Sequence, residues 1–179
     1  MVGLAVAVLL AASGCTARWS SDQGKRVSPE GSSYSYKVPH GFLVEDSSEA
    51  VSTPWKQYKT GVFIPSEAVA IRVREQPMPG MVADTPGHVL TLEKAFIAEA
   101  SRWPHPATNW RHTSAAGAPA LRYHLSGQTL GGKRQDAEEV AVFSGQHLVY
   151  VSCNWAEESK RDIALKGCKE VLKSLHVAS

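Results

Sequence analysis

The stretch KRQDAEEVAVFSGQHLVYVSC, residues 133–153, decides the fold class. Its two halves are rich in valine and other β-prone residues, and Ser144-Gly145 separates them where a tight turn fits. Two such runs joined by so short a turn predict an antiparallel hairpin. The architecture of the domain depends on what flanks this hairpin.

More β-prone runs precede the hairpin, each bounded by proline, glycine or polar residues. In the clearest, EAVAIRVRE at 67–75, the side chains of Val69, Ile71 and Val73 alternate with others and are expected to face a core. The remaining strands are expected at 34–38, 42–45, 55–64, 109–114 and 118–127.

Two amphipathic helices are predicted as well. The first begins with Thr85 as N-cap and Pro86 at the first helical position, and Pro104 ends it. The second covers about 158–174. Apolar residues recur at spacings of three and four in the first helix: Val89, Leu92, Phe96, Ala100 and Trp103. Six or seven strands in consecutive hairpins, with two helices packed on them, give an α+β class with a mostly antiparallel sheet.

Composition limits the function classes. The chain has 179 residues, 43% of them hydrophobic, which suits one domain with short extensions. Its net charge of +2 gives no reason to expect nucleic acid as a partner. No apolar run is long enough to span a bilayer.

The N-terminus carries the clearest location signal. Residues 2–12 form an apolar run of eleven residues, which as a helix would span roughly 16 Å, the length of a signal peptide. The sequence ASGC at 12–15 resembles the bacterial lipoprotein signal, in which an aliphatic residue and two small residues precede the lipidated cysteine. Ala12 stands where leucine is usual, and no basic residue precedes the run. The resemblance implies a leader over 1–14 and diacylation of Cys15.

Two alternatives to lipidation stay open, a plain secretory signal and a cytosolic N-terminal element. Residues 15–33 are rich in serine and glycine and lack periodicity, so we expect a flexible tether, with a single domain over 34–179. Basic residues in the tether, such as Arg26, could touch anionic headgroups; a solvated linker is the simpler interpretation.

The other two cysteines are expected to pair. Cys153 ends a predicted strand, and Cys168 lies on the apolar face of the last helix, which packs on the sheet. In an exported protein such a pair meets an oxidising compartment. A metal or redox pair is the alternative, but no further ligands stand at metal spacing and no Cys-x-x-Cys occurs.

No catalytic signature is present, and we expect no catalytic residues, metal or cofactor. The Gly127–Lys133 segment fits a phosphate-binding loop by spacing, but it joins strand to strand, so a hairpin turn is expected. Among seven histidines no pair stands at helical ligand spacing, although His112 and His124 lie in strands and could be neighbours. The adjacent Glu138 and Glu139 should point to opposite faces of a strand, as solvated side chains.

An apolar groove for a partner is a further hypothesis. The residues that could line it are aromatic or sulfur-containing and lie near loop ends: Trp55, Met78, Met81, Trp110 and Trp155. Packing of the same side chains in the core is the alternative.

The body of the chain also resembles a known family. The points of likeness are YSYKVPHGF at 34–42, GAPA at 117–120, Cys153 in the last strand, and GCKEVLKSL at 167–175. They resemble small actinobacterial lipoproteins of the PsbP-like fold, of the LpqN type. That resemblance implies an antiparallel sheet sandwiched by helices, used for binding or assembly without chemistry of its own.

Together these features predict a lipid-anchored binding or assembly module on the extracytoplasmic face of the cell membrane. Its expected partners are the membrane, through the lipid on Cys15, and another envelope protein or an apolar ligand. Two other functions stay open, an enzyme acting on envelope lipid or glycan and a structural stabiliser of a membrane complex.

Overall fold

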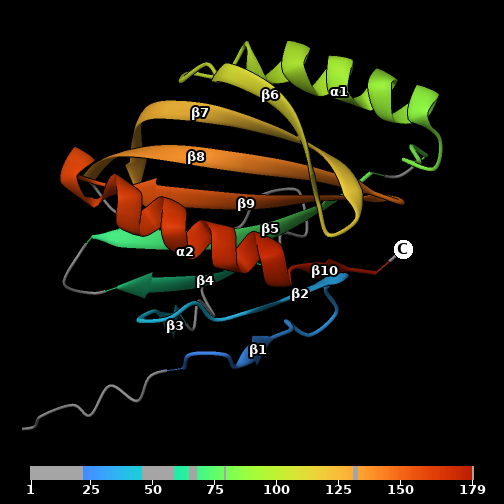
Figure 1. Cartoon of the computed structure of the whole chain (residues 1–179). Coiled ribbons are helices and arrows are strands. Elements are labelled where there is room, and N and C mark those ends of the chain that lie inside the picture. Colours follow the sequence, from blue (N-terminus) through green and yellow to red (C-terminus); the bar gives the residue numbers. More distant parts are fainter. Residues whose placement is uncertain (1–21, 46–58, 65–67, 79, 131–132, 179) are drawn as a thin grey trace, which may run out of the picture.

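A seven-stranded antiparallel sheet with a helix on each face forms the body of the protein (Figure 1). The computed structural model describes residues 22–45, 59–64, 68–78, 80–130 and 133–178. In spatial order the strands of this part of the chain are β3 (Leu43–Glu45), β4 (Lys59–Ile64), β5 (Val69–Pro77), β9 (His147–Trp155), β8 (Lys133–Ser144), β7 (Ala118–Leu130) and β6 (Thr108–Ala115).

The predicted hairpin forms the centre of this sheet. β8 and β9 pair antiparallel from Asp136 opposite Trp155 to Ser144 opposite His147. Gly145 in the turn has a φ of 55°, a left-handed conformation that glycine adopts without steric cost. β5 then pairs antiparallel with β9, which joins the N-terminal and C-terminal halves of the sheet. The expected α+β class and antiparallel sheet are confirmed.

A second, small sheet with the order β1-β2-β10 lies in the lower part of Figure 1. Its strands are β1 (Arg26–Val27), β2 (Tyr34–Lys37) and β10 (His176–Val177). β1 falls inside the predicted tether, and the amide of Val38 donates to Lys25 O over 2.9 Å. The described part of the tether therefore pairs with the domain rather than extending from it. Strands of two residues are too short to show a period in the sequence.

Helix α1 (Pro86–Ala100) covers one face of the large sheet. Thr85 is its N-cap, as predicted, and its hydroxyl accepts from the amide of His88 over 3.2 Å. The stripe led by Leu92 and Phe96 packs against Tyr123 and Tyr150 of the sheet. The helix ends at Ala100, before the predicted stop, and the half-buried Trp103 still packs edge-on against Phe96.

Helix α2 (Arg161–Ser174) covers the other face, after a single 3₁₀ turn (Glu158–Lys160). Ala164, Cys168 and Val171 pack against the β5 residues predicted to face a core, with Ile71 and Val73 fully buried there. Within the described residues no helix is both long and apolar enough to cross a bilayer.

Gly167 of α2 marks the closest packing of this helix on the sheet. A Cβ atom added there would lie 2.5 Å from the Phe42 ring and 2.9 Å from Ile71 Cδ1. We expect Gly167→Ala to lower the free energy of unfolding by about 2 kcal/mol, because overpacking outweighs the better helix propensity of alanine. Urea unfolding measures this, with the exposed neighbour Lys166→Ala as control within about 0.5 kcal/mol of wild type. A Gly167→Ala protein as stable as wild type would contradict the close packing.

Candidate functional site: a polar pocket beside α2

Along β7 and β8, the side chains on the sheet face that carries α2 change from apolar to polar. On this face Ala120, Val140 and Val142 are buried in the same cluster as the apolar residues of α2. Farther along the same faces come Arg122 and His124 on β7, and Glu138 and Asp136 on β8. Alternate residues of a strand share a face, so these polar side chains occupy positions that are apolar elsewhere in the core.

A polar pocket of about 320 Å³ lies at this end of the sheet. Residues from four strands, the 3₁₀ turn and the start of α2 line it: Asn109, Arg111, Arg122, Tyr123, His124, Asp136, Glu138, Trp155, Glu158 and Arg161. Three arginines thus share the lining with three carboxylates. The backbone of Asn109 has a φ of 56° where β6 breaks its register with β7, which bends the rim strand at the pocket.

Each carboxylate of the pocket is held by a neighbour. Glu138 Oε1 lies 3.4 Å from Arg122 Nη1, and Asp136 accepts from the amide of Gly127 over 2.7 Å. The buried indole of Trp155 donates to Glu158 Oε2 over 3.3 Å. The pocket therefore offers paired donors and acceptors that an incoming polar group can share.

The base of the pocket is aromatic and cationic. The ring of His124 lies 5.9 Å from that of Trp155, and the guanidinium of Arg161 lies 5.9 Å from the same indole. Serine, threonine and cysteine are absent from the described lining, so it offers none of these side chains as a nucleophile. The paired arginines and carboxylates suit recognition of polar and charged groups.

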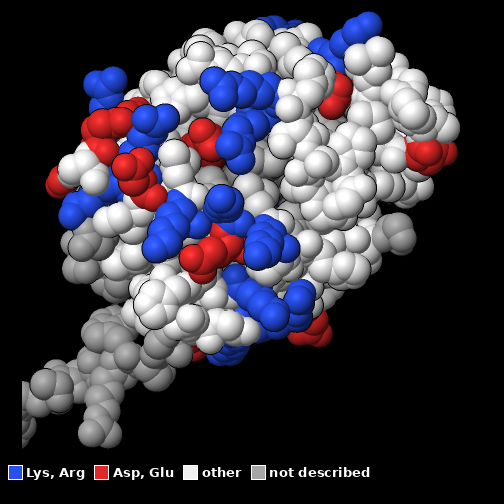
Figure 2. Space-filling model, in the orientation of Figure 1, with Lys and Arg blue, Asp and Glu red and all other residues white. Residues whose placement is uncertain are grey.

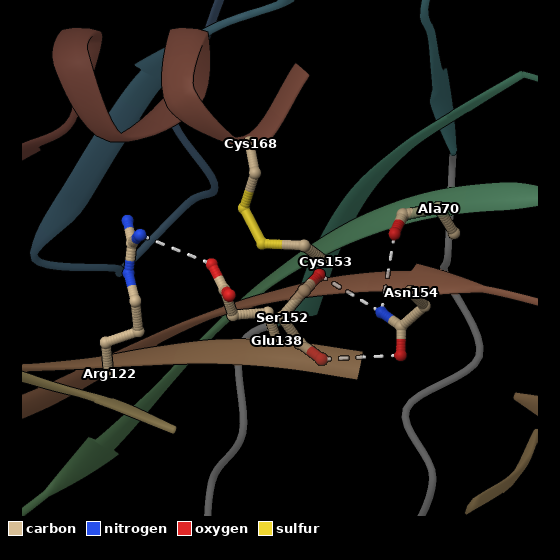
Figure 3. Close-up of a disulfide and its surroundings, with 7 residues drawn as sticks. All are labelled: Ala70, Arg122, Glu138, Ser152, Cys153, Asn154 and Cys168. Carbon is tan, nitrogen blue, oxygen red and sulfur yellow. Dashed lines mark hydrogen bonds and ion pairs between the residues drawn. A yellow bond between two sulfur atoms is a disulfide. The ribbon is translucent and has the colours of Figure 1, made fainter. Parts of the chain in front are cut away.

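The predicted disulfide lies next to the pocket and is confirmed. Cys153 of β9 and Cys168 of α2 are bonded, with their Cα atoms 5.9 Å apart. Cys153 is the partner of Glu138 in the β8–β9 register, and Figure 3 shows the Arg122–Glu138 pair on the same side of the strands as the disulfide. The disulfide fixes the helix against the strand that carries the base of the pocket.

Glu139 points to the opposite face from Glu138, as predicted, but it is not solvated. It is 3% exposed, and it accepts from the Tyr123 hydroxyl over 2.5 Å. Arg74 Nη2 lies 3.4 Å from Glu139 Oε2, and the Arg74 guanidinium lies 4.3 Å from the Tyr150 ring centroid. The expectation of a solvated face was wrong because β8 is a central strand, covered here by the α1 layer.

The two tyrosines of this cluster resist ionisation. Burial raises the pKa of Tyr123 well above its ordinary value of 10.0, and the Glu139 carboxylate raises it further. Burial also raises the pKa of Tyr150. Because both pKa values are higher in the folded chain, the stability tied to them is present below about pH 10 and is lost as the pH rises.

In an alkaline titration we therefore expect both phenolate signals to appear together with unfolding. Phenolate absorbance and circular dichroism, followed in parallel, measure this. Tyr123→Phe and Tyr150→Phe should each reduce the late absorbance change. Ionisation of either tyrosine in a chain that keeps its native circular dichroism would contradict the buried cluster.

The four described residues of the predicted groove do not line one surface. Met78 is buried and Trp110 half-buried on the α1 side, where Trp110 packs 4.7 Å from Tyr123. Trp155 is 1% exposed and lies on the α2 side. Met81 is 49% exposed, and Trp55 lies outside the described residues. Packing against two separate cores accounts for Trp110 and Trp155, because their large apolar area gains most from leaving water.

The histidines also separate. His112 faces α1, where its Nδ1 lies 3.3 Å from Glu93 Oε2, whereas His124 faces the polar pocket. The expectation that they could be neighbours is therefore wrong, because they occupy opposite faces of the sheet. Over the described residues, no group of three or more histidine, cysteine, aspartate or glutamate side chains could hold a metal.

Sequence reasoning missed the pocket itself. Of the lining residues, the sequence patterns point only to His124, Glu138 and Trp155, and they place none of the three beside the arginines. The signal that could have revealed the pocket is the change from apolar to polar residues at every second position of β7 and β8. Such a change marks the part of a sheet face that a helix leaves uncovered.

Solved structures share this fold. Cyanobacterial PsbP (CyanoP) from Synechocystis sp. PCC 6803 superposes with a TM-score of 0.55 at 15% sequence identity, covering 86% of this chain and 91% of that chain. The chain has the PsbP fold. LpqN of Mycobacterium tuberculosis, described as involved in cell envelope biogenesis, gives a TM-score of 0.52 at 12% identity, over 88% of this chain and 87% of LpqN.

A protein from Bacteroides thetaiotaomicron VPI-5482 is similar over only part of its length. Its TM-score is 0.55 at 12% identity, and the match covers 88% of this chain but 49% of that one. No known protein-family model matches the sequence, and no curated protein matches it significantly. At these identities the comparisons show the PsbP fold and leave the activity to be argued from the residues.

Proposed function

We propose that this protein is a lipid-anchored binding module of the bacterial cell envelope, held on the extracytoplasmic face of the membrane through Cys15. The observation that carries the proposal is the Cys153–Cys168 disulfide. It suits an oxidising compartment, and it uses two of the three cysteines in the sequence, so Cys15 lies outside that bond. That cysteine follows an apolar run and two small residues, as in a lipoprotein signal.

The fold comparison supports the location. LpqN, one of the solved structures with this fold, is described as involved in cell envelope biogenesis. A role in envelope assembly fits a domain with the same architecture and an N-terminal anchor. Two acyl chains give firm membrane attachment, since each buried methylene contributes about 0.8 kcal/mol.

The polar pocket is the binding site in this proposal. Two of its arginines pair with two of its carboxylates, Arg122 with Glu138 and Arg161 with Glu158, and charged side chains of an envelope protein can exchange with them on docking. This lining favours a protein partner with polar groups over the apolar ligand that the sequence also allowed. It supports binding without catalysis.

An enzyme acting on envelope glycan or lipid is the second candidate. One observation favours it: His124 and Glu138 are register partners and both line the pocket. In this structure, however, Glu138 pairs with Arg122, and His124 packs on Trp155. If His124→Ala abolished the cellular role without weakening partner binding, the enzyme would become the better candidate.

Cell fractionation with a cysteine variant tests the proposal. The wild-type protein should sediment with membranes and be released by detergent but not by high salt. Cys15→Ser should lose the acylated form and accumulate with its leader uncut. Equal acyl labelling of the two proteins would overturn the anchor.

Crosslinking tests the pocket. A photoreactive residue at Asn109, on the exposed rim, should capture one discrete envelope protein. The same residue at the exposed Lys94 of α1, on the far face, serves as the matched control. Identical products from both positions, or none from Asn109, would count against the pocket as the docking site.

A further inference from the structure

We propose that an anionic lipid surface binds one side of this domain and holds the anchored protein in a single orientation. The surface, here called the basic face, consists of five exposed side chains on β1, β2, the residue before β1, and the second half of α2. They are Lys25, Arg26, Lys37, Lys169 and Lys173. The inference rests on the proposed function, because it takes the lipid anchor as given.

Two adjoining hollows bring these side chains together. The first, of about 520 Å³, is lined by residues that include Arg26, Lys37 and Lys173. The second, of about 460 Å³, is lined by residues that include Lys169 and, again, Lys173. Lys173 links the two, so four of the five basic side chains line one continuous surface, and Lys25 precedes Arg26 in the chain. Figure 2 shows basic side chains gathered over α2 and continuing toward the small sheet.

The charge of the basic face is strongly asymmetric. Its five cations stand beside two carboxylates, Asp22 and Glu170, so its net charge of +3 exceeds the +2 of the entire chain. Glu170 Oε2 accepts from the amide of His40 over 3.1 Å, and Asp22 accepts from the amide of Val44 over 3.2 Å. Both carboxylates therefore accept from backbone amides, and Asp22 Oδ1 also lies 3.8 Å from Lys25 Nζ. All five basic side chains, Lys25 included, remain exposed.

The anchor and the basic face are close along the chain. Six residues separate Cys15 from Asp22, the first described residue, and the seven residue steps between them reach at most about 25 Å when fully extended. The basic face begins three residues later, at Lys25. Tethering over so short a distance raises the effective concentration of lipid headgroups at this face. Clustered basic residues beside a membrane anchor are attracted by anionic lipids within a Debye length.

The opposite side of the molecule then faces away from the membrane. α1 lies across the large sheet from α2 and the small sheet (Figure 1). Its Lys94 is exposed and remote from the basic face, and it provides an internal reference.

Amine labelling of the lipidated mature protein tests the orientation. The protein is inserted into vesicles of phosphatidylcholine alone or of phosphatidylcholine with phosphatidylglycerol, and the labelling rate of each lysine is read by mass spectrometry. In the anionic vesicles Lys37, Lys169 and Lys173 should label about threefold more slowly, and salt should reverse the protection. Lys94 should label equally in both. Equal rates at the basic face in both vesicles would overturn the proposal.

A triple variant distinguishes protection caused by the charge of the basic face from protection caused only by closeness to the membrane. Lys37→Gln/Lys169→Gln/Lys173→Gln should abolish the lipid-dependent protection of Lys25, whereas the matched control Lys94→Gln should retain it. Protection of Lys25 that persists in the triple variant would contradict the basic face.

Flotation with neutral vesicles tests the lipid anchor independently of the basic face. A protein that floats with neutral vesicles but shows no lysine protection in anionic ones is anchored without the basic face. A protein without acyl chains that floats only with anionic vesicles has the basic face without the anchor. Flotation with neither vesicle overturns both proposals.

Discussion

Replacing Cys153 and Cys168 together by alanine is expected to lower the free energy of unfolding by about 3 kcal/mol, because the disulfide closes a loop of 15 residues. The loop joins β9, at the centre of the sheet, to α2, which covers the largest buried cluster. Without the bond the helix depends on its apolar stripe alone. Urea unfolding of both proteins under oxidising conditions measures the difference.

The double variant removes two sulfur atoms from the core as well as the crosslink. Chemical reduction of the wild-type protein controls for this loss of volume. Reduced wild type keeps both thiols in the core, so a loss close to that of the double variant assigns the effect to the crosslink. If the double variant unfolds within 1 kcal/mol of wild type, a loss far below the usual 2–4 kcal/mol, the bond does not hold the helix as described.

Glu139→Ala is expected to be nearly as damaging, at about 2–3 kcal/mol. The substitution leaves the buried Tyr123 hydroxyl without its acceptor and Arg74 without its carboxylate. Burial lowers the pKa of Arg74 and the carboxylate of Glu139 raises it, with a net upward shift, so the cation stays charged. Denaturant unfolding near neutral pH measures the loss.

The neighbouring residue supplies a matched control. Glu138 lies on the other face of the same strand and pairs with Arg122 at 3.4 Å, where both side chains are partly exposed. Glu138→Ala should therefore cost less than about 1 kcal/mol. Equal losses at the two positions would mean that the alternation of β8 does not place one carboxylate in the core and the other at the pocket.

Much of the fold could be predicted from the sequence because its signals are local. Thr85 and Pro86 set the start of α1 through capping chemistry confined to one turn. Val69, Ile71 and Val73 fix the buried face of β5 through a period of two. β1 and β10 could not be predicted, because a strand of two residues is stabilised by its partner strand and shows no sequence pattern of its own.

The candidate site was harder to predict because strands distant in sequence build it. Arg122 and Glu138 meet through the β7–β8 hairpin, whereas Arg161 reaches the pocket only because α2 packs back over β9. The location of the Trp155 side chain also depends on tertiary structure, since a tryptophan at a strand end suits a core and a binding groove equally well. Which of the two it occupies depends on where α2 lies.

The mass of the N-terminal peptide of the mature protein, purified from membranes, tests the central claim most directly. The account predicts a peptide that begins at Cys15 and carries a diacylglyceryl group on its sulfur, while the Cys153 and Cys168 peptides remain joined until reduction. A mature chain that retains residues 1–14 and has an unmodified thiol at position 15 would contradict it.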